Sequence, residues 1–199
     1  MKTKHVFIEG LWGVGKSTLK SKLPELGYSM VSEPDHTVAD SVTLEGDELF
    51  FSWYKAAFAQ KLLNHACMPG NYAFERSFAS TLAFYEAMTG KSHDYLTKMH
   101  LDENEWSHYR SADAQCLLLN FSPEGYQRTR APYLEDRQMR LFLEENPHLI
   151  FSYQTILHDY CNLLFGENDV LEIQVGSDDG FFSKEDILSQ VSKVLEQKN

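Results

Sequence analysis

The chain has 199 residues, of which 43% are apolar and 24% charged, and this composition predicts one well-buried domain over residues 1–199. Its net charge of −11 argues against nucleic acids and anionic membranes as partners, because an acidic surface repels both. No apolar run approaches the length of a membrane span, and the three cysteines are far apart without metal-binding spacing. We therefore expect a cytoplasmic protein with reduced thiols.

Strand-like and helix-like segments alternate along the chain. Apolar runs predict strands at residues 6–8, 28–31, 72–74, 116–119 and 170–175. Apolar residues at helical spacing predict helices from Leu19 up to Pro24, over 51–62, over 78–88, over 149–164 and after Ser183, a typical N-cap residue. A polar stretch over 36–48 predicts a surface loop. This order predicts an α/β fold of three layers, α/β/α, with a five-stranded parallel sheet covered on both faces.

Residues 10–18 match G-x-x-x-x-G-K-[ST], the pattern of a phosphate-binding P-loop. A predicted strand precedes the match and a predicted helix follows it, which counts against a chance match in a glycine-containing loop. The glycines let backbone N–H groups turn toward a phosphate, and the helix start adds partial positive charge. Lys16 is expected to reach the β- and γ-phosphates of ATP, and Ser17 to bind Mg²⁺. The expected nucleotide contacts are Gly10, Gly13, Val14, Gly15, Lys16, Ser17 and Thr18.

Carboxylates and arginines recur where the predicted strands end. Glu33 follows the second strand, Glu75 and Arg76 follow the third, and Arg128 and Arg130 come shortly after the fourth. Ligands of parallel sheets bind beyond the carboxyl ends of the strands, so we expect these side chains to meet at one site. Each has a structural alternative: a turn at Glu33, an ion pair between Glu75 and Arg76, and a solvated helix face for the arginines.

Over most of its length the chain resembles the thymidylate kinase and deoxynucleoside kinase families of P-loop kinases. The segments that carry the resemblance are 7–18 and Glu33-Pro34 for both families, 74–77 for deoxynucleoside kinases, and 80–85 and 125–131 with 136–137 for thymidylate kinases. The resemblance implies a P-loop NTPase fold with a short arginine-bearing lid over about 126–140. It also implies ATP and Mg²⁺ as cofactors and a nucleotide or nucleoside as substrate. Families of this kind are often homodimers.

The activity that the resemblance implies is ATP-dependent phosphoryl transfer to a nucleoside monophosphate. One alternative is a deoxynucleoside kinase that phosphorylates a 5′-hydroxyl, whose proton Glu33 would take. A further alternative is a P-loop NTPase that is not a kinase. Glu75 would orient Mg²⁺, and Arg76 would bind the phosphate or sugar of the acceptor. Arg128 and Arg130 would close over the transferred group and stabilise its charge.

Some positions depart from one family or the other. Trp12 or Gly13 stands where thymidylate kinases usually carry a charged residue, and Ser32 stands where they usually have an arginine. Residues 52–54 lack the base-reading glutamine of deoxynucleoside kinases, and Lys55 is the candidate replacement for a cation on the same helix. We expect the substrate to contact Trp12, Glu33, Tyr54, Lys55, Arg76 and Tyr85. The alternative is that Trp12 only covers the loop and that the two tyrosines belong to the core.

Overall fold

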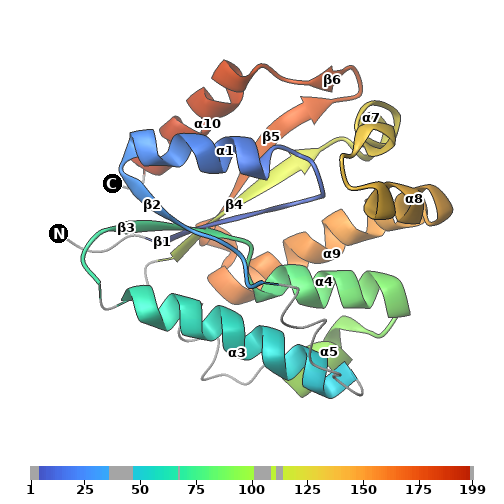
Figure 1. Cartoon of the computed structure of the whole chain (residues 1–199), viewed down its shortest axis with the longest axis horizontal. Coiled ribbons are helices and arrows are strands. Elements are labelled where there is room, and N and C mark those ends of the chain that lie inside the picture. The colour runs from blue at the N-terminus through green and yellow to red at the C-terminus, as the bar shows by residue number, and fades with distance from the viewer. Residues whose placement is uncertain (1–4, 36–46, 67, 101–108, 111–113, 198–199) are drawn as a thin grey trace.

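The computed structural model describes residues 5–35, 47–66, 68–100, 109–110 and 114–197. Its centre is a six-stranded sheet with strand order β2-β3-β1-β4-β5-β6 (Figure 1). Five strands are parallel: β1 (His5–Gly10), β2 (Tyr28–Val31), β3 (Asn71–Glu75), β4 (Ala114–Phe121) and β5 (Val170–Ser177). The sixth, β6 (Gly180–Phe181), runs antiparallel to β5. The predicted parallel sheet is confirmed, with one added strand whose two residues are too few to show a periodicity.

The central strand is β1, which pairs with β3 on one side and with β4 on the other. All six of its residues are buried, as expected for a parallel strand covered by helices on both faces. The ring of Phe7 stacks on Phe74 of β3, with centroids 4.6 Å apart, and lies 5.1 Å from the ring of Phe165. The loop that follows β1 therefore starts from the middle of the core.

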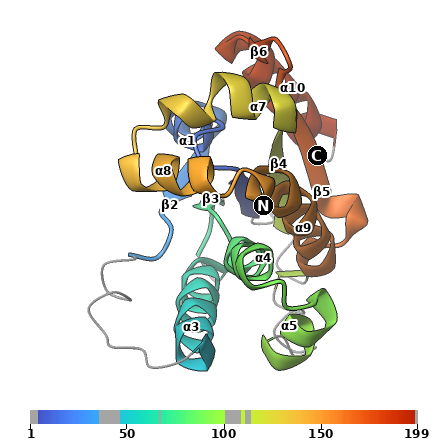
Figure 2. The same ribbon diagram turned by 90° about the vertical axis from the view of Figure 1, so that its right-hand side faces the viewer.

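Helices cover both faces of the sheet, which confirms the predicted three layers (Figures 1 and 2). One face carries α1 (Lys16–Lys22) and α10 (Lys184–Gln197). The other carries α3 (Asp47–Ala66), α4 (Phe78–Thr89) and α9 (His148–Phe165). A shorter helix, α5 (His93–His100), contacts α4, and a 3-10 turn, η3 (Glu167–Asp169), precedes β5.

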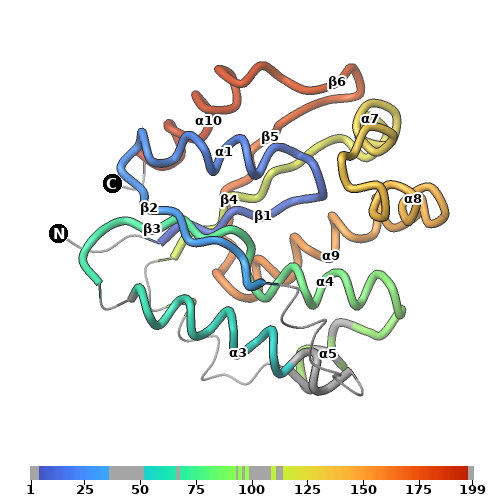
Figure 3. Tube along the Cα trace, viewed as in Figure 1, coloured from blue at the N-terminus to red at the C-terminus, as the bar shows by residue number. Residues whose placement is uncertain are grey.

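Two short helices lie near the ends of β4 and β5 and beside the loop that follows β1 (Figure 3). They are α7 (Pro123–Thr129) and α8 (Arg137–Glu145), joined through the 3-10 turn η2 (Ala131–Tyr133). The hydroxyl of Ser122 accepts a hydrogen bond from the backbone N–H of Gly125 and so caps the start of α7. The predicted lid, residues 126–140, lies in this segment.

Local signals in the sequence explain where two other helices begin and end. Helix α1 ends at Lys22, and the 3-10 turn η1 (Leu23–Leu26) follows, as Pro24 predicts. The hydroxyl of Ser183 accepts a hydrogen bond from the backbone N–H of Asp186 at 3.1 Å, which confirms the predicted cap of α10.

The prediction of a surface loop over residues 36–48 is wrong for its last two residues. Asp47 and Glu48 form the first turn of α3, where acidic side chains are favoured by the helix dipole, and residues 36–46 lie outside the described chain. Within the described segments, no helix combines the length and apolar character needed to cross a membrane.

Candidate functional site

Glycines shape the loop between β1 and α1. Gly10 and Gly13 have backbone φ angles of 142° and 70°, which residues with a Cβ atom rarely adopt. A Cβ atom on Gly10 would lie 2.7 Å from the carbonyl oxygen of Leu119, and one on Gly13 would lie 2.5 Å from a methyl group of Leu134. The loop therefore fits closely against β4 and against the lid. It leads directly into α1, whose first residue is Lys16.

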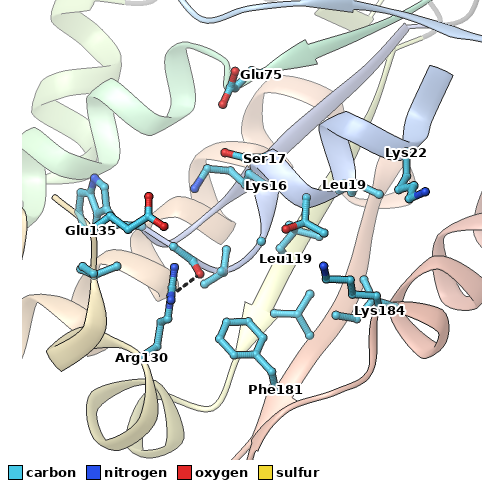
Figure 4. Close-up of a pocket in the computed structure, with 18 of the residues that line it drawn as sticks. Lys16, Ser17, Leu19, Lys22, Glu75, Leu119, Arg130, Glu135, Phe181 and Lys184 are labelled. Atoms are coloured by element: carbon cyan, nitrogen blue, oxygen red, sulfur yellow. Dashed lines mark hydrogen bonds between the residues drawn. The ribbon is translucent and has the colours of Figure 1, made fainter.

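A cavity of about 600 Å³ lies over this loop (Figure 4). Six of the seven predicted nucleotide contacts line it: Gly13, Val14, Gly15, Lys16, Ser17 and Thr18. The carboxylate end of the cavity consists of Glu33, Glu75 and Arg76, at the ends of β2 and β3. The lid end consists of residues from the lid, β5, β6, α10 and the short segment between β6 and α10: Arg130, Leu134, Glu135, Asp136, Met139, Val175, Phe181, Phe182, Lys184, Ile187 and Leu188. The expected meeting at one site is thus observed for Glu33, Glu75, Arg76 and Arg130, but Arg128 is not among the described residues that line the cavity.

Lys16 lies at the floor of the cavity and is only 8% exposed. Its Nζ donates hydrogen bonds to the backbone carbonyl oxygens of Gly10, at 2.9 Å, and of Leu11. Burial and the nearby Arg76 guanidinium hold the pKa of Lys16 well below its usual range, and neighbouring carboxylates oppose this shift only in part. Additional negative charge in the cavity would stabilise the ammonium, and a bound phosphate supplies that charge.

Arg76 is held in one orientation at the carboxylate end. Its backbone φ angle of 63° is the only positive one outside glycine in the described chain, and such strained residues cluster at functional sites. Its Nε lies 3.2 Å from Oε2 of Glu33, and its Nη1 donates to the hydroxyl oxygens of Ser80 at 3.0 Å and Tyr153 at 3.5 Å. The ion pair considered between Glu75 and Arg76 is therefore replaced by one between Glu33 and Arg76.

Behind Arg76 lies a buried carboxylate, Glu9, which the sequence analysis missed. Its Oε1 accepts hydrogen bonds from the backbone N–H of Ser77 at 2.6 Å and from the Ser77 hydroxyl at 2.7 Å, and its Oε2 accepts one from Ser80. Burial raises the pKa of Glu9, while Arg76 and these hydrogen bonds act in the opposite direction. The sequence did contain a signal for Glu9: a carboxylate that directly follows the apolar run 6–8 is unusual in a buried strand and indicates a functional or structural role.

Two lysines that the sequence analysis did not single out bind the strand ends. Lys20, one turn after Lys16 in α1, forms an ion pair with Glu75 at 2.7 Å and donates to the hydroxyl of Ser32 at 3.0 Å. Lys61 of α3 donates to the backbone carbonyl of Glu33 at 2.7 Å. These contacts link α1 and α3 to the segment that follows β2, and α1 also to the last residue of β3, and the Lys20 ion pair holds the carboxylate of Glu75.

The two predicted lid arginines lie in different surroundings. Arg130 lines the cavity, its Nε donates to the carbonyl oxygen of Gly13 at 2.7 Å, and its guanidinium lies 5.8 Å from the ring centre of Phe181 (Figure 4). Arg128 is exposed on α7, outside the described residues that line the cavity. A second bond fastens the lid to the loop, because the Tyr126 hydroxyl donates to the carbonyl oxygen of Trp12 at 2.6 Å.

The indole of Trp12 packs against α4 and α9, on the face of the sheet that also carries α3. Its ring centre lies 4.7 Å from that of Tyr153 in α9 and 5.7 Å from that of Phe84 in α4. Trp12 also lines the cavity, so covering the loop and contacting a ligand are both compatible with its place.

The structure places the remaining predicted substrate contacts away from the cavity. Tyr54 is buried in α3, with Trp53 at 4.7 Å between ring centres. The hydroxyl of Tyr85 accepts a hydrogen bond from Lys91 at 2.6 Å. Neither tyrosine is among the described residues that line the cavity, and the same holds for Lys55.

Ser17 and Glu75 are the residues that fit a magnesium ion. Ser17 is exposed at the start of α1, and Glu75 projects into the same cavity (Figure 4). Mg²⁺ prefers oxygen ligands and is commonly bound through one or two side chains together with substrate phosphates. Among the described residues no group of three His, Cys, Asp or Glu could hold a metal by itself. A metal at this site would therefore depend on the phosphates of a ligand.

Comparisons with known proteins identify the fold. No protein-family model matches the chain, and no curated protein sequence matches it. Among solved structures, the thymidylate kinase of Candida albicans is similar with a TM-score of 0.63 at 14% identity, covering 99% of this chain and 92% of its own. The thymidylate kinase of Ehrlichia chaffeensis has a TM-score of 0.58 at 13% identity, covering 100% of both chains. The predicted resemblance to thymidylate kinases is therefore confirmed at the level of structure: the chain has the fold of the P-loop kinases and is similar over its length to thymidylate kinases.

Proposed function

We propose that this protein is a kinase of one domain, residues 1–199, which transfers the γ-phosphate of ATP to a nucleoside monophosphate or a nucleoside. The observation that carries the proposal is the continuous cavity from the lid end, across Lys16 and Ser17, to Glu33 and Glu75. In the proposed reaction, a phosphate donor and an acceptor would bind side by side in this cavity over the glycine loop. The likeness to two thymidylate kinase structures supports the fold in which this chemistry is proposed.

The loop residues would bind the donor phosphates. Phosphoryl transfer depends on positioning and charge neutralisation more than on covalent help from the protein. The backbone N–H groups at the start of α1 and the ammonium of Lys16 would neutralise the phosphate oxygens. Ser17, with Glu75, would hold Mg²⁺, which when bound neutralises charge across the β- and γ-phosphates. Arg130 would stabilise the transferred group from the side of the lid.

The lid end of the cavity fits the base of the donor nucleotide. Phe181, Ile187 and Leu188 provide an apolar wall there, and Arg130 lies over the ring of Phe181. A flat heteroaromatic base can stack against an aromatic ring such as that of Phe181. This arrangement would leave the γ-phosphate directed toward the carboxylate end.

The test is the variant Lys16→Ala, with Lys193→Ala as its control. Lys193 is an exposed residue of α10 outside the cavity. We expect Lys16→Ala to lose ATP binding, measured by isothermal titration calorimetry, and ADP release in the presence of nucleosides and their monophosphates. Lys193→Ala should behave as the unmodified protein. Near-normal ATP binding and turnover in Lys16→Ala would refute the assignment of the loop.

A further inference from the structure

Lys20 places a positive charge at the ends of β2 and β3. Its Nζ lies 2.7 Å from Oε2 of Glu75 and donates a hydrogen bond to the hydroxyl of Ser32 at 3.0 Å. The Glu75 side chain projects into the cavity (Figure 4) and is only 15% exposed, so water screens this ion pair less than one at the open surface. Lys20 therefore neutralises the charge that Glu75 presents to the cavity.

Two other lysines near this end of the cavity have different partners. The ammonium of Lys16 donates to two backbone carbonyl oxygens of the glycine loop, and that of Lys61 donates to the backbone carbonyl of Glu33. Of these three lysines, Lys20 is the one whose ammonium contacts the Glu75 carboxylate. A new partner for that carboxylate therefore acts first on Lys20.

Glu75 is also one of the two residues that fit a magnesium ion, together with Ser17. Mg²⁺ prefers oxygen ligands, and a carboxylate is commonly one of them. An ammonium and a magnesium ion that share one carboxylate lie close together, and the divalent ion repels the ammonium twice as strongly as a monovalent ion would at the same distance. Lys20 and Mg²⁺ therefore compete for the same side chain.

The ammonium of Lys20 can leave Glu75 without losing all of its partners. The Lys20 side chain is 31% exposed, so water reaches it. The hydroxyl of Ser32 is a neutral acceptor that it contacts in the same position. A lysine side chain is flexible and carries three N–H donors, so it can exchange a carboxylate for water and keep the hydroxyl. Opening the ion pair therefore costs mainly the attraction to Glu75.

We propose that Lys20 holds the place of a cation at Glu75 and that the Lys20–Glu75 ion pair opens when a magnesium–nucleotide complex binds; this inference rests on the proposed kinase function. Lys20 is a positioning residue, because it acts through Glu75. ATP without metal leaves the ion pair closed, and Lys20 then neutralises a carboxylate that would repel the phosphates. Binding of ATP with Mg²⁺ is weakened by the cost of opening the ion pair. Lys20 thus reduces the preference of the site for the metal complex.

The first experiment measures the metal preference, defined as the Kd of ATP in EDTA divided by the Kd of ATP in saturating Mg²⁺. Isothermal titration calorimetry gives both constants. We expect the metal preference of Lys20→Met to exceed that of the unmodified protein by about fivefold or more, the lower end of typical coupling between two ligands. Lys20→Arg keeps the charge and should restore most of the normal value. Lys193→Met, at an exposed position of α10 that is not among the described residues lining the cavity, should not differ from the unmodified protein.

A double-mutant cycle separates the ion pair from the general effect of losing one positive charge near the phosphates. Glu75→Gln removes the carboxylate and nearly keeps the shape of the side chain. In the Glu75→Gln background there is no ion pair to open, so Lys20→Met should change the metal preference much less than it does beside Glu75. Equal changes in the two backgrounds would show a general charge effect and overturn the inference.

The remaining outcomes separate this inference from the function on which it rests. A lower metal preference in Lys20→Met would mean that Lys20 orients Glu75 toward the metal, and an unchanged one would mean that the ion pair stays closed. Either result would overturn the inference and leave the kinase proposal intact. Failure of the unmodified protein to bind ATP in both buffers would refute the kinase proposal itself.

Discussion

Arg130 and Arg128 are separated by two positions in the chain but face different surroundings. Arg130 reaches the loop through the carbonyl oxygen of Gly13, while Arg128 is exposed on α7. We expect Arg130→Ala to lower kcat by about two orders of magnitude, because a guanidinium that stabilises a transferring phosphate contributes strongly to the rate. Arg128→Ala should have a much smaller effect. Steady-state kinetics gives kcat for both variants, and a separate titration gives their ATP affinity. A larger fall in kcat for Arg128→Ala than for Arg130→Ala would mean that Arg128, and not Arg130, stabilises the transferred phosphate.

Glu9 shows how one buried residue connects the strands to the helices behind them. It is fully buried at the end of β1, and its carboxylate holds Ser77 and Ser80 of the segment that begins α4. Ser80 in turn accepts a hydrogen bond from Arg76. The orientation of Arg76 at the carboxylate end therefore depends on a residue that does not line the cavity.

At the scale of elements, the lid helix α7 is anchored by a close approach to β5. A Cβ atom on Gly125 would lie 2.2 Å from the carbonyl oxygen of Ser177, which is backbone and cannot move aside easily. We expect Gly125→Ala to lower the free energy of unfolding by about 1–3 kcal/mol, as overpacking does. It should also weaken the bond from Tyr126 to the loop, because α7 would shift away from the sheet.

The matched control for that change is Gln127→Ala, at an exposed position of the same helix. Its effect should stay within about 0.5 kcal/mol, since it touches no packed feature. Urea denaturation of both variants measures the difference. Equal stabilities would mean that α7 is not held against β5 in the manner described.

At the scale of the whole molecule, the net charge of −11 opposes folding through self-repulsion. Raising the salt concentration from about 10 mM to about 100 mM shortens the screening length from about 30 Å to about 10 Å. We expect the midpoint of thermal unfolding to rise over this range, measured by differential scanning calorimetry without nucleotide. Sodium chloride and choline chloride should act alike because screening depends on ionic strength; a rise with only one of them would point to specific ion binding.

Much of the fold could be predicted because its signals are local. Each of the five parallel strands is a short apolar run, and the glycine loop is a continuous motif between a strand and a helix. Parallel strands end at one edge of the sheet, so Glu33, Glu75 and Arg76 could be assigned to one site without knowing their contacts. The start of α3 was misplaced because acidic residues are common both in loops and in first helical turns.

The sequence by itself thus determined the order of the elements, the phosphate-binding loop and the edge of the sheet where the site lies. Only the tertiary structure decided the partners within that site. Lys20 reaches Glu75 across 55 positions, and Glu9 reaches Ser77 across 68. Only the tertiary structure showed that Tyr54 and Tyr85 are not among the described residues that line the cavity. Helical spacing in the sequence places residues on one face of a helix but does not say what that face contacts. Such contacts depend on how the layers pack, and that arrangement exists only in the folded chain.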